Sequence, residues 1–160
     1  MNKAFVFDFD DTLAITSARV IIHNSMSVAY KSVSSFEFPG YKLGNGESFD
    51  FSEFRDDMFI KNADPKLLMN LAREVYMEGH SVFILTARQN TVAAAINVWL
   101  MSHGVDATEI HCVGSDGDIP VSKKKILMNI VSRFDKTYFY DDSEANISIF
   151  KHEKLRSYLV

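Results

Sequence analysis

The sequence predicts an α/β protein: a three-layer, Rossmann-like sandwich with a mostly parallel sheet and a small insert after the first strand. Two patterns predict this fold. Four short apolar segments are continuous rather than alternating, as expected of strands buried on both faces of a parallel sheet. Helical patterns lie between them, and such alternation produces parallel strands with right-handed crossovers. The length of 160 residues, 47% of them apolar, indicates one domain over 1–160.

The expected strands are short and end at polar residues. They cover residues 4–7, 81–86, 110–113 and 137–140. The four C-terminal residues, SYLV, form a candidate fifth strand, which would lie at an edge of the sheet. Aliphatic and aromatic side chains, which favour strands, dominate these segments.

Three helical patterns separate the expected strands, and a fourth, shorter one follows the last. The expected helices begin after Asp64–Pro65 and end at Gly79, run from about Thr91 to His103, begin near Ser122, and begin after Ser143. In the first of them, Asp64 suits the cap position and Pro65 the first turn. In the third, Ser122 is the candidate cap.

Residues 16–64 break this alternation, because they carry no long helical face. The segments ARVIIH (18–23) and SVAYKSV (27–33) could pair as a hairpin. We expect 16–64 to be an insert, a cap or flap over one end of the sheet. Its aromatic residues are Phe36, Phe38, Tyr41, Phe49, Phe51 and Phe54. They could stack on a base or ring, but anchoring an irregular segment by apolar burial is the favoured interpretation.

Composition and charge exclude several classes of protein. The net charge of −4 gives no overall basic excess of the kind that nucleic-acid-binding domains carry, although a local basic patch remains open. The single cysteine, Cys112, excludes an internal disulfide and fits a reducing compartment. The N-terminal apolar run is cut by aspartates, and no run reaches the roughly 20 apolar residues of a membrane span. We therefore expect a cytoplasmic protein without membrane contact.

Acidic residues follow the first and last of the four main strands. Asp8 and Asp10 come directly after the first strand, and Asp141 and Asp142 follow the fourth. Thr86 ends the second. Because the carboxyl ends of parallel strands meet at one edge of a sheet, these side chains should converge there. Clustered carboxylates repel one another and need a cation, and hard oxygen ligands suit Mg²⁺.

This set of groups fits phosphoryl transfer through a carboxylate. One aspartate attacks phosphorus and forms an aspartyl-phosphate. A metal ion offsets the repulsion between the anionic nucleophile and the anionic phosphate. A hydroxyl and a lysine hold phosphate oxygens, while a second acid protonates the leaving group.

The lysine of this set comes from the run SKKK at the start of the third helix. Lys123 lies three and four residues before Ile126 and Leu127, so it should point toward the sheet. Lys124 is the second candidate, and Lys125 is expected in solvent.

The chain resembles the haloacid dehalogenase-like (HAD) phosphohydrolases in four motifs that occur in order: FVFDFDDTL, VFILTAR, one lysine and YFYDDS. The segments YKLGNGESFDFSEFR and GSDGDIPVSK are similar to those of small, phage-type members with a short insert after the first motif. The resemblance implies catalytic residues at Asp8, Asp10, Thr86 and Lys123, and a metal site made by Asp8, Asp10, Asp141 and Asp142. Asp11 occupies the variable position of the first motif, where a turn or solvent is expected.

The roles that the resemblance implies differ between these residues. Asp8 would be the nucleophile, and Asp10 the general acid and base, with its backbone carbonyl on Mg²⁺. Thr12 would brace the loop on the substrate-binding side, and Thr86 would hydrogen-bond the phosphoryl oxygens. Arg88 could bind the substrate phosphate, pair with an acid of the site, or lie at the surface.

The expected function is Mg²⁺-dependent hydrolysis of a phosphomonoester: a nucleotide, a small metabolite or a nucleic-acid 3′-phosphate. One alternative is a phosphoacceptor domain of the response-regulator type, but neither the second nor the third strand ends in the aspartate that it needs. A catalytically silent binding module on the same fold is the other alternative.

Overall fold

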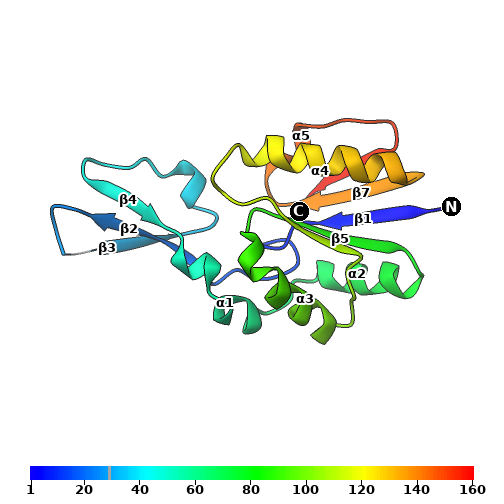
Figure 1. Cartoon of the computed structure of the whole chain (residues 1–160), viewed down its shortest axis with the longest axis horizontal. Coiled ribbons are helices and arrows are strands. Elements are labelled where there is room, and N and C mark those ends of the chain that lie inside the picture. Colours follow the sequence, from blue (N-terminus) through cyan, green and yellow to red (C-terminus); the bar gives the residue numbers. More distant parts are fainter. Residues whose placement is uncertain (29) are drawn as a thin grey trace.

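The computed structural model describes residues 1–28 and 30–160 and confirms the α/β class (Figure 1). Its main sheet has five parallel strands in the order β6-β5-β1-β7-β8. They are β1 (Lys3–Phe7), β5 (Ser81–Thr86), β6 (Glu109–Cys112), β7 (Lys136–Asp141) and β8 (Leu155–Leu159). The four expected inner segments are strands within one residue of the expected bounds. The C-terminal strand lies at an edge, as predicted, and begins earlier, at Leu155.

Helices cover both faces of this sheet (Figure 1). They are α2 (Leu68–Met77) and α3 (Ala93–Ser102) on one face, and α4 (Ile119–Arg133) and α5 (Glu144–Ser148) on the other. Strand β1 shows how alternate side chains supply both layers: Phe7 packs in the cluster that contains Trp99, whereas Val6 packs in the cluster that contains Leu127. Within the described residues, no helix combines the length and the apolar character that crossing a membrane requires.

The first helix begins later than its local signal predicts. Asp64 does not cap it, and α2 starts at Leu68. The backbone around Pro65 pairs instead with the chain after β1: the Ile15 amide donates to the Asp64 carbonyl at 2.8 Å, and the Lys66 amide donates to the Leu13 carbonyl at 2.8 Å. A segment held extended by these bonds cannot form the first helical turn.

The third helix begins earlier than expected. Its cap is Asp118, whose side chain accepts a hydrogen bond from the Val121 amide at 3.1 Å, and Pro120 lies in its first turn. Ser122 was the expected cap, but it lies inside the helix, and its amide donates to the Asp118 carbonyl. A short 3-10 turn over Asn90–Val92 precedes α3, near its expected start.

The segment after β1 forms a second, antiparallel sheet with the order β3-β2-β4. Its strands are β2 (Arg19–Asn24), β3 (Tyr30–Ser34) and β4 (Glu47–Asp50), with a short helical turn at Phe38–Gly40 between β3 and β4. A second turn at Ser52–Arg55 and the short helix α1 (Met58–Lys61) lead from β4 to α2. The expected hairpin between β2 and β3 is present, although Ala29, within its second segment, lies outside the described residues. Figure 1 shows this small sheet beyond the carboxyl ends of the parallel strands.

Candidate active site

Three carboxylates meet at the carboxyl edge of the main sheet. Asp8 follows β1, Asp141 ends β7, and Asp142 comes next, and one oxygen of each lies within 4.8 Å of the others. The parallel register, which places Phe7 beside Tyr140, brings the strand ends together. Asp8 and Asp141 are buried, whereas Asp142 is exposed. A set of carboxylate oxygens without thiolate or imidazole fits a hard cation such as Mg²⁺.

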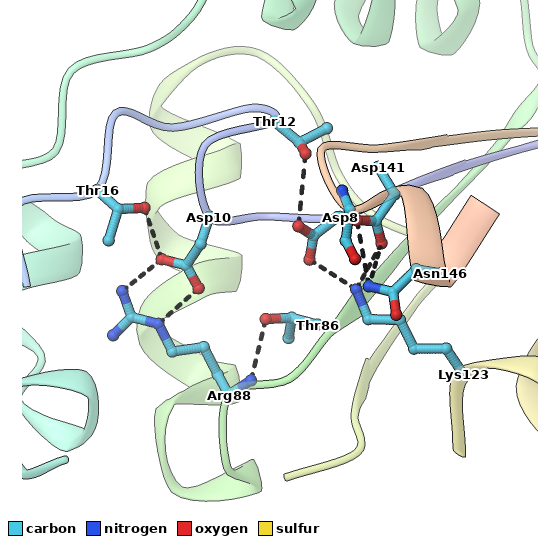
Figure 2. A network of polar contacts seen from close by, with 10 residues as sticks. Asp8, Asp10, Thr12, Thr16, Thr86, Arg88, Lys123, Asp141 and Asn146 are labelled. Carbon is cyan, nitrogen blue, oxygen red and sulfur yellow. Dashed lines mark hydrogen bonds and ion pairs between the residues drawn. The ribbon is translucent and has the colours of Figure 1, made fainter. Parts of the chain in front are cut away.

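A buried lysine sits between two of these acids. Lys123, from the first half of α4, is 1% exposed. Its Nζ donates to Asp8 Oδ1 at 3.0 Å and to Asp141 Oδ2 at 2.7 Å (Figure 2). Lys124 is partly exposed and Lys125 is exposed. The helical spacing from the core positions therefore identified which lysine reaches the acids, although the helix start was misplaced.

The pKa values in this cluster follow from burial and from the close charges. Burial raises the pKa of Asp8 well above its ordinary range; Lys123 opposes this effect, and the neighbouring acids add to it. Burial alone would lower the pKa of Lys123, but the charges of Asp8 and Asp141 outweigh it and raise that pKa. Burial also raises the pKa of Asp142. The three acids thus gain from any further cation placed among them.

Asp141 is held by several donors besides Lys123. The Asn146 side-chain amide donates to Asp141 Oδ1 at 3.2 Å and Oδ2 at 3.1 Å, and the Ser143 amide donates to Oδ1 at 2.8 Å. Asn146 is buried in α5 and was not among the residues expected at the site. The available signal was its place in the sequence, at the third residue of the short helix that follows the paired acids. A buried amide needs a polar partner, and these acids are close to it.

Asp10 points away from the other acids and pairs with Arg88 (Figure 2). Arg88 Nε and Nη2 donate to the two oxygens of Asp10 at 2.9 and 2.7 Å, and Thr16 Oγ1 donates to Asp10 Oδ1 at 2.8 Å. Arg88 is 3% exposed, so of its three expected positions the structure shows the pair with an acid. The side chain of Asp10 is not part of the carboxylate group that could hold a metal; the resemblance assigned that ligand to its backbone carbonyl.

Arg88 also contacts the segment between the sheets. Its Nη1 donates to the Phe54 carbonyl at 2.8 Å, and its guanidinium lies 4.8 Å from the centre of the Phe54 ring. One buried side chain therefore connects Asp10 to the turn at Ser52–Arg55.

The two expected threonines lie beside these acids. Thr12 is buried, and its hydroxyl donates to Asp8 Oδ2 at 3.4 Å, so it braces this carboxylate. Thr86 ends β5, is fully buried, and accepts a hydrogen bond from the Arg88 amide at 3.1 Å. A hydroxyl that accepts keeps its own proton to donate, which suits contact with an anionic oxygen.

Asp11, expected in a turn, lies in one and also joins the strand end to the second sheet. Its backbone is left-handed, with φ of 58°, a conformation that costs a non-glycine residue free energy. Its side chain accepts hydrogen bonds from the Thr16 amide at 3.2 Å and from Ser35 Oγ at 2.5 Å, and its carbonyl accepts one from Lys66 Nζ at 2.7 Å.

A cavity of about 510 Å³ opens in front of Asp8. Its charged lining residues include Asp8, Asp10, Arg88, Lys123 and Asp142. Aromatic residues of 16–64 line it as well, including Phe36, Phe51 and Phe54. The polar cluster thus faces a space large enough for a small organic molecule.

No family model and no curated protein matches the chain. Two solved structures share its fold at low sequence identity. One is a chain of the Pnkp1/Rnl/Hen1 RNA repair complex, with a TM-score of 0.63, 14% identity, and coverage of 100% of this chain and 42% of that one. The other is a HAD-superfamily hydrolase, subfamily IA, variant 1, from Geobacter sulfurreducens PCA, with a TM-score of 0.50, 11% identity, and coverage of 91% and 82%. This chain thus spans less than half of the repair-complex chain and has a HAD-like fold.

Proposed function

We propose that this protein is a Mg²⁺-dependent phosphomonoester hydrolase that works through an aspartyl-phosphate on Asp8. The observation that carries this proposal is the meeting of Asp8, Asp141, Asp142 and the buried Lys123 beside the cavity, which Asp8, Asp142 and Lys123 line. The HAD-like fold, shared with a hydrolase, supports it. The substrate is a phosphorylated small molecule or a phosphorylated nucleic-acid end.

In the proposed reaction, an oxygen of Asp8 attacks phosphorus and the bond from phosphorus to the leaving oxygen breaks. The leaving oxygen takes a proton from Asp10, which then accepts a proton from the water that hydrolyses the acyl phosphate. Asp10 is bound to Arg88 and Thr16, so this role requires its side chain to turn toward the leaving group.

The other residues position charge. Lys123 already donates to Asp8 and can offset the negative charge that accumulates as phosphate approaches. Thr86 would donate its hydroxyl proton to a phosphoryl oxygen. Asp8, Asp141 and Asp142 would hold Mg²⁺, which supplies positive charge against the repulsion between carboxylate and phosphate.

The phosphoacceptor alternative gains no support from the observed strands. It needs an aspartate at the end of the second or third strand along the chain of the main sheet, and these strands, β5 and β6, end at Thr86 and Cys112.

The test is hydrolysis of p-nitrophenyl phosphate with Mg²⁺ and with EDTA, by the wild type and by Asp8→Asn. We expect activity only with the metal, and a fall in kcat of about 10³-fold or more in Asp8→Asn, because a carboxamide cannot serve as the nucleophile. Asp106→Asn, at an exposed aspartate away from the cavity, is the matched control and should keep the wild-type rate. Metal-dependent turnover that survives in Asp8→Asn would refute the proposal.

A further inference from the structure

One of the six aromatic residues named from the sequence of 16–64 differs from the other five. Those five pack on the buried cluster of Val20, Ile22 and Val33 in the small sheet: Phe38, Tyr41, Phe49, Phe51 and Phe54. They are anchors, as the favoured interpretation predicted, but they anchor to the small sheet and not to the core of the main sheet. Phe36 is 86% exposed, and within the described part of the chain its ring has no aromatic partner. Folding alone therefore does not explain an aromatic side chain at this position.

The exposed ring faces the same space as the proposed nucleophile. Phe36 and Asp8 both line the cavity of about 510 Å³, which lies within the usual range for small-molecule sites. The residue before Phe36 is bound to the loop that follows β1, because Ser35 Oγ donates to Asp11 Oδ2 at 2.5 Å. The backbone that carries the ring is thus held next to the loop of Asp8, Asp10 and Asp11.

A cation that lines the cavity has no polar partner in the described part of the chain. Arg55 is exposed, and within residues 1–28 and 30–160 its side chain forms no hydrogen bond or ion pair. The two other cations of the cavity, Arg88 and Lys123, are bound to acids. Beside the bound charges, the lining of the cavity therefore offers the flat apolar face of Phe36 and the free positive charge of Arg55.

From these features we propose that the substrate is a nucleoside phosphate whose base stacks on Phe36 while its phosphate lies at Asp8. This inference rests on the proposed function and specifies its substrate class. A small aliphatic alcohol as leaving group has no flat face to cover the ring of Phe36, whereas every nucleobase has one. If the nucleoside belonged to a nucleic-acid strand, Arg55 could pair with the phosphodiester next to it.

The experiment compares kcat/KM for 3′-AMP and 5′-AMP with kcat/KM for glycerol 2-phosphate. In the wild type we expect a preference for at least one nucleotide. Phe36→Ala should reduce the ratio of nucleotide to glycerol phosphate by about 5- to 150-fold, the range that loss of one base-stacking contact produces. Phe36→Tyr should keep the ratio, because it keeps a planar ring.

Tyr30→Ala is the matched control. Tyr30 is another exposed aromatic residue of the small sheet, 70% exposed, and it does not line the cavity. Its removal should leave the ratio at the wild-type value. A ratio that Phe36→Ala does not change, or that Tyr30→Ala changes equally, would overturn the stacking role.

A binding measurement separates this inference from the proposed function. Titration calorimetry measures the affinity of 3′-AMP and 5′-AMP for Asp8→Asn, with and without Phe36→Ala. It therefore shows how much Phe36 contributes to nucleotide binding in the absence of turnover. If glycerol phosphate is hydrolysed but the nucleotides are neither preferred nor bound through Phe36, only the substrate class is wrong. If p-nitrophenyl phosphate is turned over but neither nucleotides nor glycerol phosphate are, the substrate class is again wrong; if none of the three is turned over, the hydrolase proposal fails, and this inference fails with it.

The source of the nucleoside phosphate is decided with a short 3′-phosphorylated oligonucleotide and with the variant Arg55→Gln. Faster turnover of the oligonucleotide than of 3′-AMP, lost in Arg55→Gln, identifies a nucleic-acid end. Equal rates that Arg55→Gln does not change identify a free nucleotide.

Discussion

Replacing Lys123 with methionine tests the charge arrangement at the site most directly. In the wild type, the ammonium group donates to Asp8 and Asp141, and all three side chains are almost fully buried. Methionine fills much of the same volume and removes only the charge and the donors. Asp141 keeps Asn146 and the Ser143 amide as donors, whereas among the described residues the donor that Asp8 keeps is the Thr12 hydroxyl, at a long 3.4 Å, beside its contact with the acidic Asp142. Most of the loss should therefore fall on Asp8.

The magnitude follows from removing one partner of a buried ion pair, which costs about 3–5 kcal/mol. With a urea m-value of about 2 kcal/mol/M, this lowers the urea midpoint by roughly 1.5–2.5 M. Lys124→Met, at the partly exposed neighbour, should change stability by only about 0.5 kcal/mol. Mg²⁺ should stabilise Lys123→Met more than the wild type, because a bound cation replaces the lost charge.

The pH dependence of Lys123→Met has a definite sign. Burial already raises the pKa of Asp8, and the loss of Lys123 removes the charge that opposes this effect. An acid whose pKa is higher in the folded state binds more protons when folded, so stability decreases as pH rises above the unfolded value of about 4. The deficit relative to the wild type should be smaller at pH 5 than at pH 8. Equal urea midpoints at pH 8, or a deficit that grows as pH falls, would refute this reasoning.

Three further predictions concern the loop, Arg88 and the cysteine. Arg88→Met should lower the free energy of unfolding by about 2–4 kcal/mol, because it leaves Asp10 without its buried partner. Amide hydrogen exchange in 52–55 should become faster, because the bond to the Phe54 carbonyl is lost. Unchanged exchange there would count against the link between Arg88 and this turn. Asp11→Ala should lower the free energy of unfolding by about 1–3 kcal/mol more than Asp11→Gly does, since only glycine takes the positive φ freely. Thermal unfolding of both variants measures this difference, and a glycine variant less stable than the alanine variant would contradict it. Burial raises the pKa of Cys112 to about 11, so alkylation by iodoacetamide at pH 8 should be far slower than in urea, and equal rates would contradict the half-buried thiol.

The helix starts show where local sequence signals suffice and where they do not. An aspartate followed closely by proline occurs at Asp64–Pro65 and again at Asp118–Ile119–Pro120. The second signal marks the start of α4, whereas the first does not start a helix. The difference lies in a long-range contact: the backbone around Pro65 bonds to the chain after β1, which no local pattern reveals.

In the site, too, some contacts could be predicted from the sequence and others could not. The strand ends and the helical spacing of Lys123 were sufficient to bring Asp8, Asp141, Asp142 and Lys123 together, because parallel topology fixes where buried strands end. The partner of Arg88 could not be chosen from three alternatives, since the long side chain can reach several acids. The contact between Ser35 and Asp11 spans 24 positions and depends on how the small sheet packs, which its sequence does not specify.

The loop that follows β1, which carries Asp8, Asp10 and Asp11, connects the proposed catalytic groups to the segment proposed to bind the base. Asp8 is bound by groups of the main sheet and its helices, through Lys123 and Thr12. Asp10 is bound by Arg88, which also holds the Phe54 carbonyl, and Asp11 is bound by Ser35. Successive residues of one loop thus contact first the main sheet with its helices and then the small sheet and the turn that follows it. A change in the turn at Ser52–Arg55 should therefore alter the orientation of Asp10 as well as the wall of the cavity, so that substrate preference and catalytic rate change together.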